Sequence, residues 1–307
     1  MKFVNSINDI TLIHSTIEGA EDYSAFSYML NENYGFISVY DGAEKIGDKK
    51  YFQIEGHSEA YLASRVVADT TVKWFKKSGF TFSRYDAEYI GSEYYKALKE
   101  TKLKIDTDGT AVVGSKRSFP TSATVIGFDC TNQDFAKLEF LYTGNTRGYI
   151  IDEVGLCQIT KEDSSTGKVY ENGAPTPQSD IQNILSADGE EAVNYRAIKV
   201  KYPAMLIAAT DGAFSNIQNP MMFEKMVLTA ISECENLKEF EKRLQFALNK
   251  DADDDYTVMT AIFGFKTFED IKQYYATRLK VLNEKYCDAF EKGDATKWEQ
   301  YKKSYYR

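Results

Sequence analysis

The 307-residue chain has an ordinary globular balance of 43% hydrophobic and 27% charged residues, and it is long enough for one large domain or two small ones. Its net charge of −9 argues against a nucleic-acid partner, which requires a basic surface, and no apolar run is long enough to span a bilayer. Its cysteines are widely spaced and form no C-x-x-C pair, so they favour a reducing compartment over a disulfide framework. We therefore expect a cytoplasmic protein without a membrane span.

The first part of the chain predicts strands with acidic residues between them. Phe3 to Ile13 alternates loosely and predicts a first strand or pair of strands. The pair Glu21-Asp22 then stands directly before a second predicted strand, Tyr23–Leu30. The apolar run Phe36–Tyr40 predicts a strand buried in a sheet, and it ends in Asp41-Gly42. Taken alone, an Asp-Gly pair after a strand is also typical of an ordinary turn.

Two helices are predicted next. Ser58 can cap a helix that runs to Lys77 and stops at Gly79, because apolar and small residues recur in it every four positions. A second helix begins at Asp86 and places four apolar residues on one face: Ile90, Tyr94, Ala97 and Leu98. Two helices inserted between strands predict a helical layer that covers a sheet.

The middle of the chain predicts more strands and one long loop. Ala123–Phe128 and Lys137–Tyr142 predict strands, and the second runs into Gly144-Asn145-Thr146-Arg147 and on to a strand at Gly148–Ile151. Thr160 to Asp180 is polar and rich in glycine and proline, which predicts an exposed loop or flap.

The arrangement of a buried strand followed by an acid recurs in the second half. Leu206–Thr210 ends in Asp211-Gly212, and Asp253-Asp254-Asp255 stands directly before a predicted strand at Tyr256–Phe263. Two amphipathic helices, Met221–Ser232 and Leu237–Leu248, lie between them. Three strands that present acids at their ends can bring hard oxygen ligands together, which is what a Mg²⁺ or Mn²⁺ site requires.

The character of the sequence changes near its end. We expect an α+β domain over residues 1–266 and a helical extension over residues 267–307, with a break at Gly293-Asp294. The extension carries an apolar stripe at helical spacing, formed by Phe268, Ile271, Tyr275, Leu279 and Leu282. Because such a stripe must be covered, we expect it to pack against the body of the same chain and the protein to be a monomer.

The order of these motifs resembles the PP2C, or PPM, family of metal-dependent protein serine/threonine phosphatases. The resemblance spans roughly Ile10 to Phe265, and each motif is weak alone although the set is specific in order and spacing. It implies a β-sandwich of two antiparallel sheets flanked by helix pairs, with a metal site in a channel at one end. It also implies hydrolysis of phosphoserine or phosphothreonine in a phosphoprotein.

The resemblance assigns roles to particular residues. Asp41 matches the aspartate that bridges two Mn²⁺ or Mg²⁺ ions, and the backbone carbonyl of Gly42 matches a further ligand. Asp211 and Asp254 match the acids on one ion, and Glu21, with Asp22 beside it, those on the other. Paired ions activate a bridging water and neutralise charge on the phosphoryl group, so Asp41, Asp211 and Asp254 are the implied catalytic residues.

The sequence also departs from the family pattern. Ile17 stands where the phosphate-binding arginine is usual, and Ala43 replaces the histidine of D-G-H-G-G. Asn145 and Ser215 replace two acids that help to hold a third metal. These losses leave two hypotheses open: a phosphatase of low activity, or a pseudophosphatase that keeps the fold to bind partners. A structural Ca²⁺ site is a weaker third, since such sites draw clustered ligands from one loop.

Overall fold

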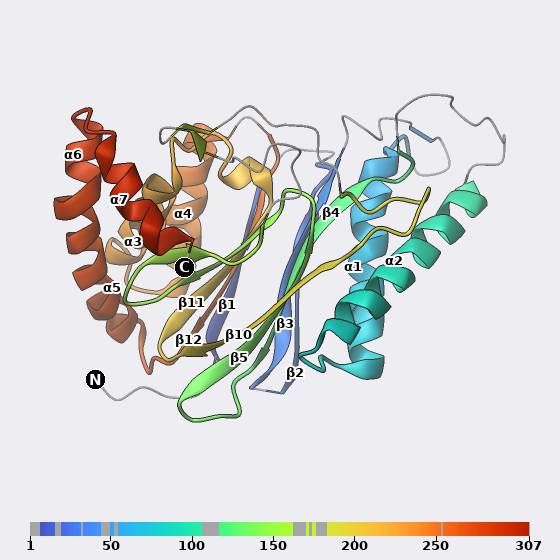
Figure 1. Cartoon of the computed structure of the whole chain (residues 1–307), viewed down its shortest axis with the longest axis horizontal. Helices are drawn as coiled ribbons and strands as arrows, with labels where there is room; N and C mark the ends of the chain where they lie inside the picture. Colours follow the sequence, from blue (N-terminus) through green and yellow to red (C-terminus); the bar gives the residue numbers. More distant parts are fainter. Residues whose placement is uncertain are drawn as a thin grey trace.

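The computed structural model describes residues 7–15, 20–31, 33–43, 50–51, 55–105, 117–161, 170–171, 174–175, 183–252 and 254–306. In this part of the chain, two five-stranded antiparallel sheets lie face to face, and helices cover the outer face of each (Figure 1). The predicted α+β sandwich is therefore confirmed. No described helix combines the length and apolar character needed to cross a membrane.

The first sheet has the strand order β1-β12-β11-β6-β7. Its strands are β1 (Ile7–His14), β12 (Thr257–Phe263), β11 (Ala204–Ala209), β6 (Arg147–Ile151) and β7 (Leu156–Gln158). The second sheet has the order β10-β5-β4-β3-β2. Its strands are β10 (Asn194–Lys201), β5 (Phe135–Thr143), β4 (Thr121–Asp129), β3 (Tyr34–Gly42) and β2 (Tyr23–Asn31).

A separate two-stranded hairpin, β8 (Tyr170–Glu171) and β9 (Ala174–Pro175), lies within the segment predicted as a flap. Most of that segment lies outside the described residues.

The strand β3 shows why the central strands are apolar on both faces. Ile37 and Val39 point into the core between the two sheets. Phe36 and Tyr40 point the other way, into a second core under the helices α1 (Glu59–Ser78) and α2 (Arg84–Ile105). Because successive side chains of a strand alternate in direction, a strand covered on both sides needs an unbroken apolar run.

The ends of the first helix follow the sequence signals. The side chain of Ser58 accepts a hydrogen bond from the backbone N–H of Tyr61, and Gly79 adopts a φ of 66° at the C-terminal end. Both residues satisfy backbone groups that a helix end leaves open. The second helix begins at Arg84, two residues before Asp86, which lies in its first turn.

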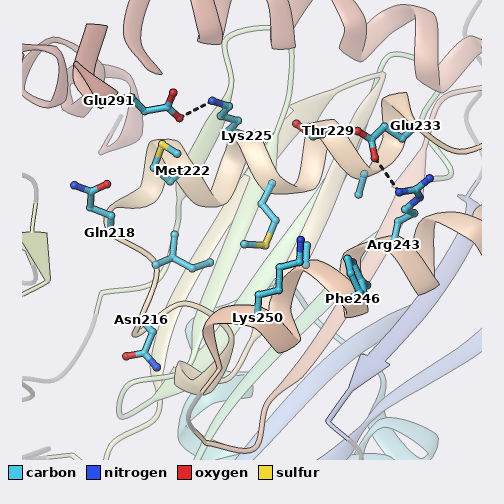
Figure 2. A pocket seen from close by; sticks show the side chains of 14 residues that line it. Asn216, Gln218, Met222, Lys225, Thr229, Glu233, Arg243, Phe246, Lys250 and Glu291 are labelled. Carbon is cyan, nitrogen blue, oxygen red and sulfur yellow. Dashed lines mark hydrogen bonds and ion pairs between the residues drawn. The ribbon is translucent and has the colours of Figure 1, made fainter. Parts of the chain in front are cut away.

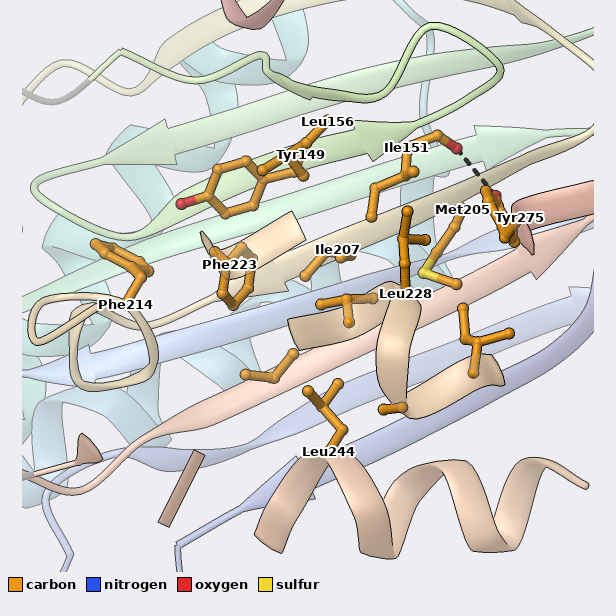
Figure 3. Close-up of a cluster of buried hydrophobic side chains, with 14 of the residues drawn as sticks. Tyr149, Ile151, Leu156, Met205, Ile207, Phe214, Phe223, Leu228, Leu244 and Tyr275 are labelled. Atoms are coloured by element: carbon orange, nitrogen blue, oxygen red, sulfur yellow. Dashed lines mark hydrogen bonds between the residues drawn. The ribbon is translucent and has the colours of Figure 1, made fainter. Parts of the chain in front are cut away.

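The outer face of the first sheet is covered by α3 (Pro220–Ser232), α4 (Leu237–Asp251) and the C-terminal helices. Figure 3 shows Tyr149 and Ile207 of the sheet meeting Leu228 of α3 and Leu244 of α4. The C-terminal elements are α5 (Phe268–Leu282), a π-helical turn (Asn283–Cys287), α6 (Asp288–Glu291) and α7 (Thr296–Tyr305).

The expectation that the C-terminal stripe packs against the same chain is confirmed. Ile271, Tyr275 and Leu282 are buried in the core of the first sheet, and the hydroxyl of Tyr275 donates a 3.0 Å hydrogen bond to the carbonyl of Ile151 (Figure 3). The domain boundary at residue 266 stays a prediction.

A buried ion pair also joins the extension to the body. The guanidinium of Arg278 in α5 contacts both carboxylate oxygens of Glu224 in α3, at 2.6 and 2.9 Å. The hydroxyl of Tyr301 in α7 donates to the same carboxylate at 2.6 Å. Three helices therefore share one charged contact inside the apolar core.

Candidate metal centre

Acidic residues from both sheets meet at one end of the sandwich. In the second sheet, Asp22 lies just before β2 and Asp41 lies at the end of β3. In the first sheet, Asp211 follows β11 and Asp255 lies two residues before β12. Since all four acids lie at strand ends on the same side of the sandwich, carboxylates that are distant in the sequence become neighbours.

Asp22 is held by groups from the opposite sheet. Its backbone N–H donates a 2.7 Å hydrogen bond to Oδ2 of Asp255, 233 residues later. The hydroxyl of Thr210 donates to Oδ2 of Asp22 at 2.6 Å and accepts from the backbone N–H of Thr257 at 2.8 Å. The carboxyl of Asp22 is only 7% exposed and therefore points into the site, although it adjoins a surface turn.

A second set of hydrogen bonds connects Asp41 with Asp211. Ser122 is the cross-strand partner of Asp41, and its hydroxyl lies 3.5 Å from Oδ2 of Asp41. The same hydroxyl donates to Oδ1 of Asn145 at 2.9 Å, and Nδ2 of Asn145 donates to Oδ2 of Asp211 at 2.7 Å. Asn145 stands where the family pattern has an acid, and its amide supplies a donor that an ionised acid lacks.

The electrostatics of the site favour positive charge. Burial raises the pKa of Asp22 well above its ordinary value, and the charges of Asp41 and Asp255 raise it further. Burial likewise raises the pKa of Asp41, with the charges of Asp211, Asp255 and Asp254 adding to the effect. The pKa of Asp255 rises to about 6, mainly through burial. These carboxyls repel one another in their ionised forms, and a bound cation would relieve that repulsion.

The glycines of the two Asp-Gly pairs allow the acid-bearing segments to approach. A Cβ at Gly212 would lie 2.1 Å from the carbonyl oxygen of Asp255. A Cβ at Gly42 would lie 2.8 Å from the carbonyl oxygens of both Glu21 and Ala60. Each Asp-Gly pair therefore combines a carboxylate with a backbone that lies directly against another acidic segment.

Glu21 is placed differently from its neighbour Asp22. Its Oε2 accepts a 2.5 Å hydrogen bond from the hydroxyl of Ser58, the residue that caps α1. Its backbone carbonyl accepts from the hydroxyl of Ser64 at 2.8 Å and from the guanidinium of Arg65 at 3.3 Å. The carboxylate of Glu21 is thus directed toward the start of α1, and the hydrogen bonds fix the turn that presents Asp22.

The structure also places the remaining residues of interest. Asp254 is exposed and its Oδ1 accepts from the backbone N–H of Asp255 at 2.9 Å, so it lies at the rim of the acidic cluster. Ile17 and Asp253 lie outside the described residues. Sequence reasoning did not single out Asp255, which lies deeper than Asp254. Its position one residue nearer to the strand was the available signal.

The carboxylate oxygens of this cluster are chemically suited to bind hard divalent cations. Carboxylate oxygens are the ligands that Mg²⁺ and Mn²⁺ prefer. The raised pKa values of Asp22 and Asp41 reflect burial and mutual repulsion, and a bound dication would relieve the repulsion. Within the described residues, however, no group of three or more His, Cys, Asp or Glu side chains is already arranged to hold an ion. One oxygen of Asp22, of Asp211 and of Asp255 instead accepts a hydrogen bond from within the site.

No protein family and no curated protein matches the sequence, whereas solved structures match the fold. The serine/threonine phosphatase PstP/Ppp of Mycobacterium tuberculosis is 18% identical, with a TM-score of 0.59 over 84% of this chain and 100% of that chain. A structure of the PstP catalytic domain with two manganese ions is 14% identical, with a TM-score of 0.54 over 83% and 98%. The PPM Ser-Thr phosphatase MsPP of Mycobacterium smegmatis is 13% identical, with a TM-score of 0.53 over 83% and 98%. The chain therefore has the fold of the PP2C/PPM phosphatases, as the sequence resemblance implied.

Proposed function

We propose that the protein is a metal-dependent protein serine/threonine phosphatase that hydrolyses phosphoserine or phosphothreonine. The observation that carries this proposal is the meeting of Asp22, Asp41, Asp211 and Asp255 from separate segments in one mutually repelling cluster, with Asp22 buried and the other three half-buried. The likeness to a PstP structure with two manganese ions supports a dinuclear site.

In this proposal the ions would be held by Asp22, Asp41 and Asp211 together with the neighbouring acids Asp254 and Asp255, and by the carbonyl of Gly42. Two Mn²⁺ or Mg²⁺ ions supply an activated water and neutralise phosphoryl charge. The chain's other residues hold the ligands in place. Thr210 orients Asp22, and the Ser122–Asn145 pair orients Asp41 and Asp211 through the hydrogen bonds described above.

The test is Mn²⁺-dependent hydrolysis of a phosphoserine peptide by the wild type and by Asp41→Asn. We expect the variant to lose at least about 100-fold in kcat/KM, because it removes charge from the centre of the donor set. Asp69→Asn makes the same chemical change on the exposed face of α1 and should leave turnover unchanged. Equal turnover by wild type and Asp41→Asn would contradict the proposal.

A second substrate tests the consequence of the missing histidine at Ala43. An aryl phosphate has a leaving group that needs little protonation, whereas phosphoserine needs a general acid, worth a factor of about 10²–10⁴. We expect the wild type to prefer the aryl phosphate, and Ala43→His to gain more on the phosphoserine peptide than on the aryl phosphate. An equal gain on both substrates would show that the change acts through binding alone.

The alternative is a pseudophosphatase that binds partners through the same fold. One observation favours it: the amide of Asn145 occupies an oxygen of Asp211, where the family pattern provides another acid. Calorimetric titration with Mn²⁺ distinguishes the outcomes. Metal binding without turnover of either substrate supports the pseudophosphatase, and absence of metal binding contradicts the dinuclear site itself.

A further inference from the structure

A trough of about 540 Å³ runs along the outer side of the α3–α4 helix pair (Figure 2). One wall is a stripe of α3 formed by Met222, Lys225, Met226 and Thr229, continued by Glu233 directly after the helix end. The other wall is a stripe of α4 formed by Arg243, Phe246, Ala247 and Lys250. Both stripes have the three- and four-residue spacing of one helix face.

The two stripes differ in how much of their apolar surface is free: Met222 and Met226 of α3 are half-buried and also pack against the core of the first sheet, whereas the α4 stripe carries a freely exposed ring. In α4, Phe240, Leu244 and Leu248 are buried in the core of the first sheet. Phe246 points elsewhere and is 61% exposed, which is unusual for a large aromatic side chain. Within the described part of the chain, the ring of Phe246 is therefore left uncovered beside the half-exposed side chains of Met222 and Met226.

The shape of the trough fits a helix. From Met222 to its last residue, Ser232, α3 rises by about 15 Å, which corresponds to about three turns of a partner helix. Both walls are helices, whose backbone groups are already bonded internally, so they offer contacts through side chains alone. This excludes strand addition and favours an amphipathic helix that lays its apolar face into a groove. Methionine side chains suit this mode because they adapt to the shape of a partner.

The charges of the trough point to an acidic partner. Two of its cations are already paired: Lys225 contacts Glu291 at 2.6 Å, and Arg243 contacts Glu233 at 3.3 Å (Figure 2). Lys250 forms no ion pair with any described residue, and its ammonium lies 4.5 Å from the centroid of the Phe246 ring. The trough thus presents a cation that pairs with no described residue, beside an exposed aromatic ring, on a protein whose net charge is −9.

We propose that this trough binds an amphipathic helix of a partner protein, which packs apolar side chains on Met222, Met226 and Phe246 and presents a carboxylate to Lys250. In protein interfaces a large aromatic side chain usually supplies much of the affinity, and a charged group beside it supplies specificity. None of these three contact residues belongs to the proposed metal site, so the proposal does not depend on phosphatase activity.

The test uses two sets of synthetic helical peptides of about 14 residues, long enough to span the trough. Both sets carry leucine at positions i, i+3, i+4 and i+7, and a flanking position is Glu in one set and Lys in the other. Binding is measured by fluorescence polarisation. We expect peptides of the Glu set to bind about two- to five-fold more tightly than their Lys counterparts, the size of an exposed ion pair.

Variants then locate the binding. Lys250→Glu should reverse the preference between the two sets, and Phe246→Ala should weaken both about ten-fold or more. Lys238→Glu makes the same charge change at an exposed position of α4 outside the trough, so it should change nothing. Circular dichroism and the thermal midpoint of each variant show that the fold is intact.

Two outcomes would overturn the proposal. One is that neither set binds the wild type, or that the preference survives in Lys250→Glu. The other concerns dodecanoate, a small anionic amphiphile used as a third probe. Saturable dodecanoate binding that depends on Lys250, without binding of any peptide, would assign the trough to a small ligand. Because no arm measures hydrolysis, failure of the phosphatase proposal leaves this test unaffected.

Discussion

The backbone N–H of Asp22 donates a 2.7 Å hydrogen bond to Oδ2 of Asp255, and the two residues are 233 positions apart in the chain. This bond joins the start of β2 in one sheet to the segment before β12 in the other. It brings two carboxylates together at the open end of the sandwich, although each raises the energy of the other in its ionised form.

The first prediction concerns the response of stability to metal. If the cluster binds Mn²⁺, the ion should raise the free energy of unfolding of chelator-treated protein, by about 2.7 kcal/mol at 100 times the dissociation constant. Without metal, Asp41→Asn should be at least as stable as the wild type, because it removes one repelling charge. The variant should lose most of the response to Mn²⁺. Urea unfolding with and without the ion measures both effects, and an identical Mn²⁺ response in both proteins would contradict the site.

The second prediction concerns the glycine that lies against Asp255. Gly212→Ala would place a Cβ 2.1 Å from a backbone oxygen, so the chain must shift, at a cost of about 1–3 kcal/mol. Because the displaced backbone carries Asp255, Mn²⁺ affinity should fall together with stability. Gly189→Ala is the matched control, since a Cβ there meets nothing within 4 Å. Calorimetry and thermal unfolding of both variants check the prediction, which fails if the two behave alike.

The third prediction concerns a buried acid far from the candidate site. Glu139 on β5 is 0% exposed, neither of its carboxyl oxygens has a partner of good hydrogen-bond geometry among the described residues, and the carboxyl of Asp86 and the backbone of Phe82 lie nearby. Burial, followed by the charge of Asp86, raises the pKa of Glu139 from 4.5 to about 9. The folded chain therefore keeps a proton that the unfolded chain releases above pH 4.5. It follows that stability falls as the pH rises from 4.5 to about 9.

Glu139→Gln should remove this pH dependence. We expect the variant to be more stable than the wild type at pH 8 and similar to it at about pH 4, where the wild-type carboxyl is protonated in both states. Glu100→Gln, on the exposed face of α2, provides the control and should follow the wild type at every pH. Urea unfolding across this range gives the free energies. A constant difference between Glu139→Gln and wild type would contradict the predicted titration.

The fourth prediction concerns the ion pair between Arg278 and Glu224. Arg278→Met leaves the fully buried Glu224 without its charged partner and should lower the free energy of unfolding by about 3–5 kcal/mol. Lys280→Met, in the same helix but exposed, should change it by no more than about 0.5 kcal/mol. Denaturant unfolding measures both values. Equal stabilities would mean that the C-terminal helices add little to the folded body.

Some features of this protein are local and are legible in the sequence alone. The helix α1 begins after Ser58 and stops at Gly79 because each residue satisfies backbone groups of its own turn. The apolar runs of β3 and β11 predict strands from their composition alone, and the acid at the end of each run is visible directly in the sequence. The apolar stripe of α5 required a cover for the same reason, and its burial follows from its pattern.

The tertiary structure alone decided which of these acids act together. Glu21 and Asp22 are adjacent in the sequence, yet one hydrogen-bonds to Ser58 and the other enters the cluster with Asp255. Gly212 reads as an ordinary turn residue until the carbonyl of Asp255 is placed against it. The Asp22–Asp255 contact arises where the two sheets pack against each other, and the Gly212–Asp255 contact arises where β11 and β12 pair within one sheet. A pattern of propensity and period describes neighbours within one segment, whereas contacts between segments more than two hundred residues apart depend on how the whole sandwich closes.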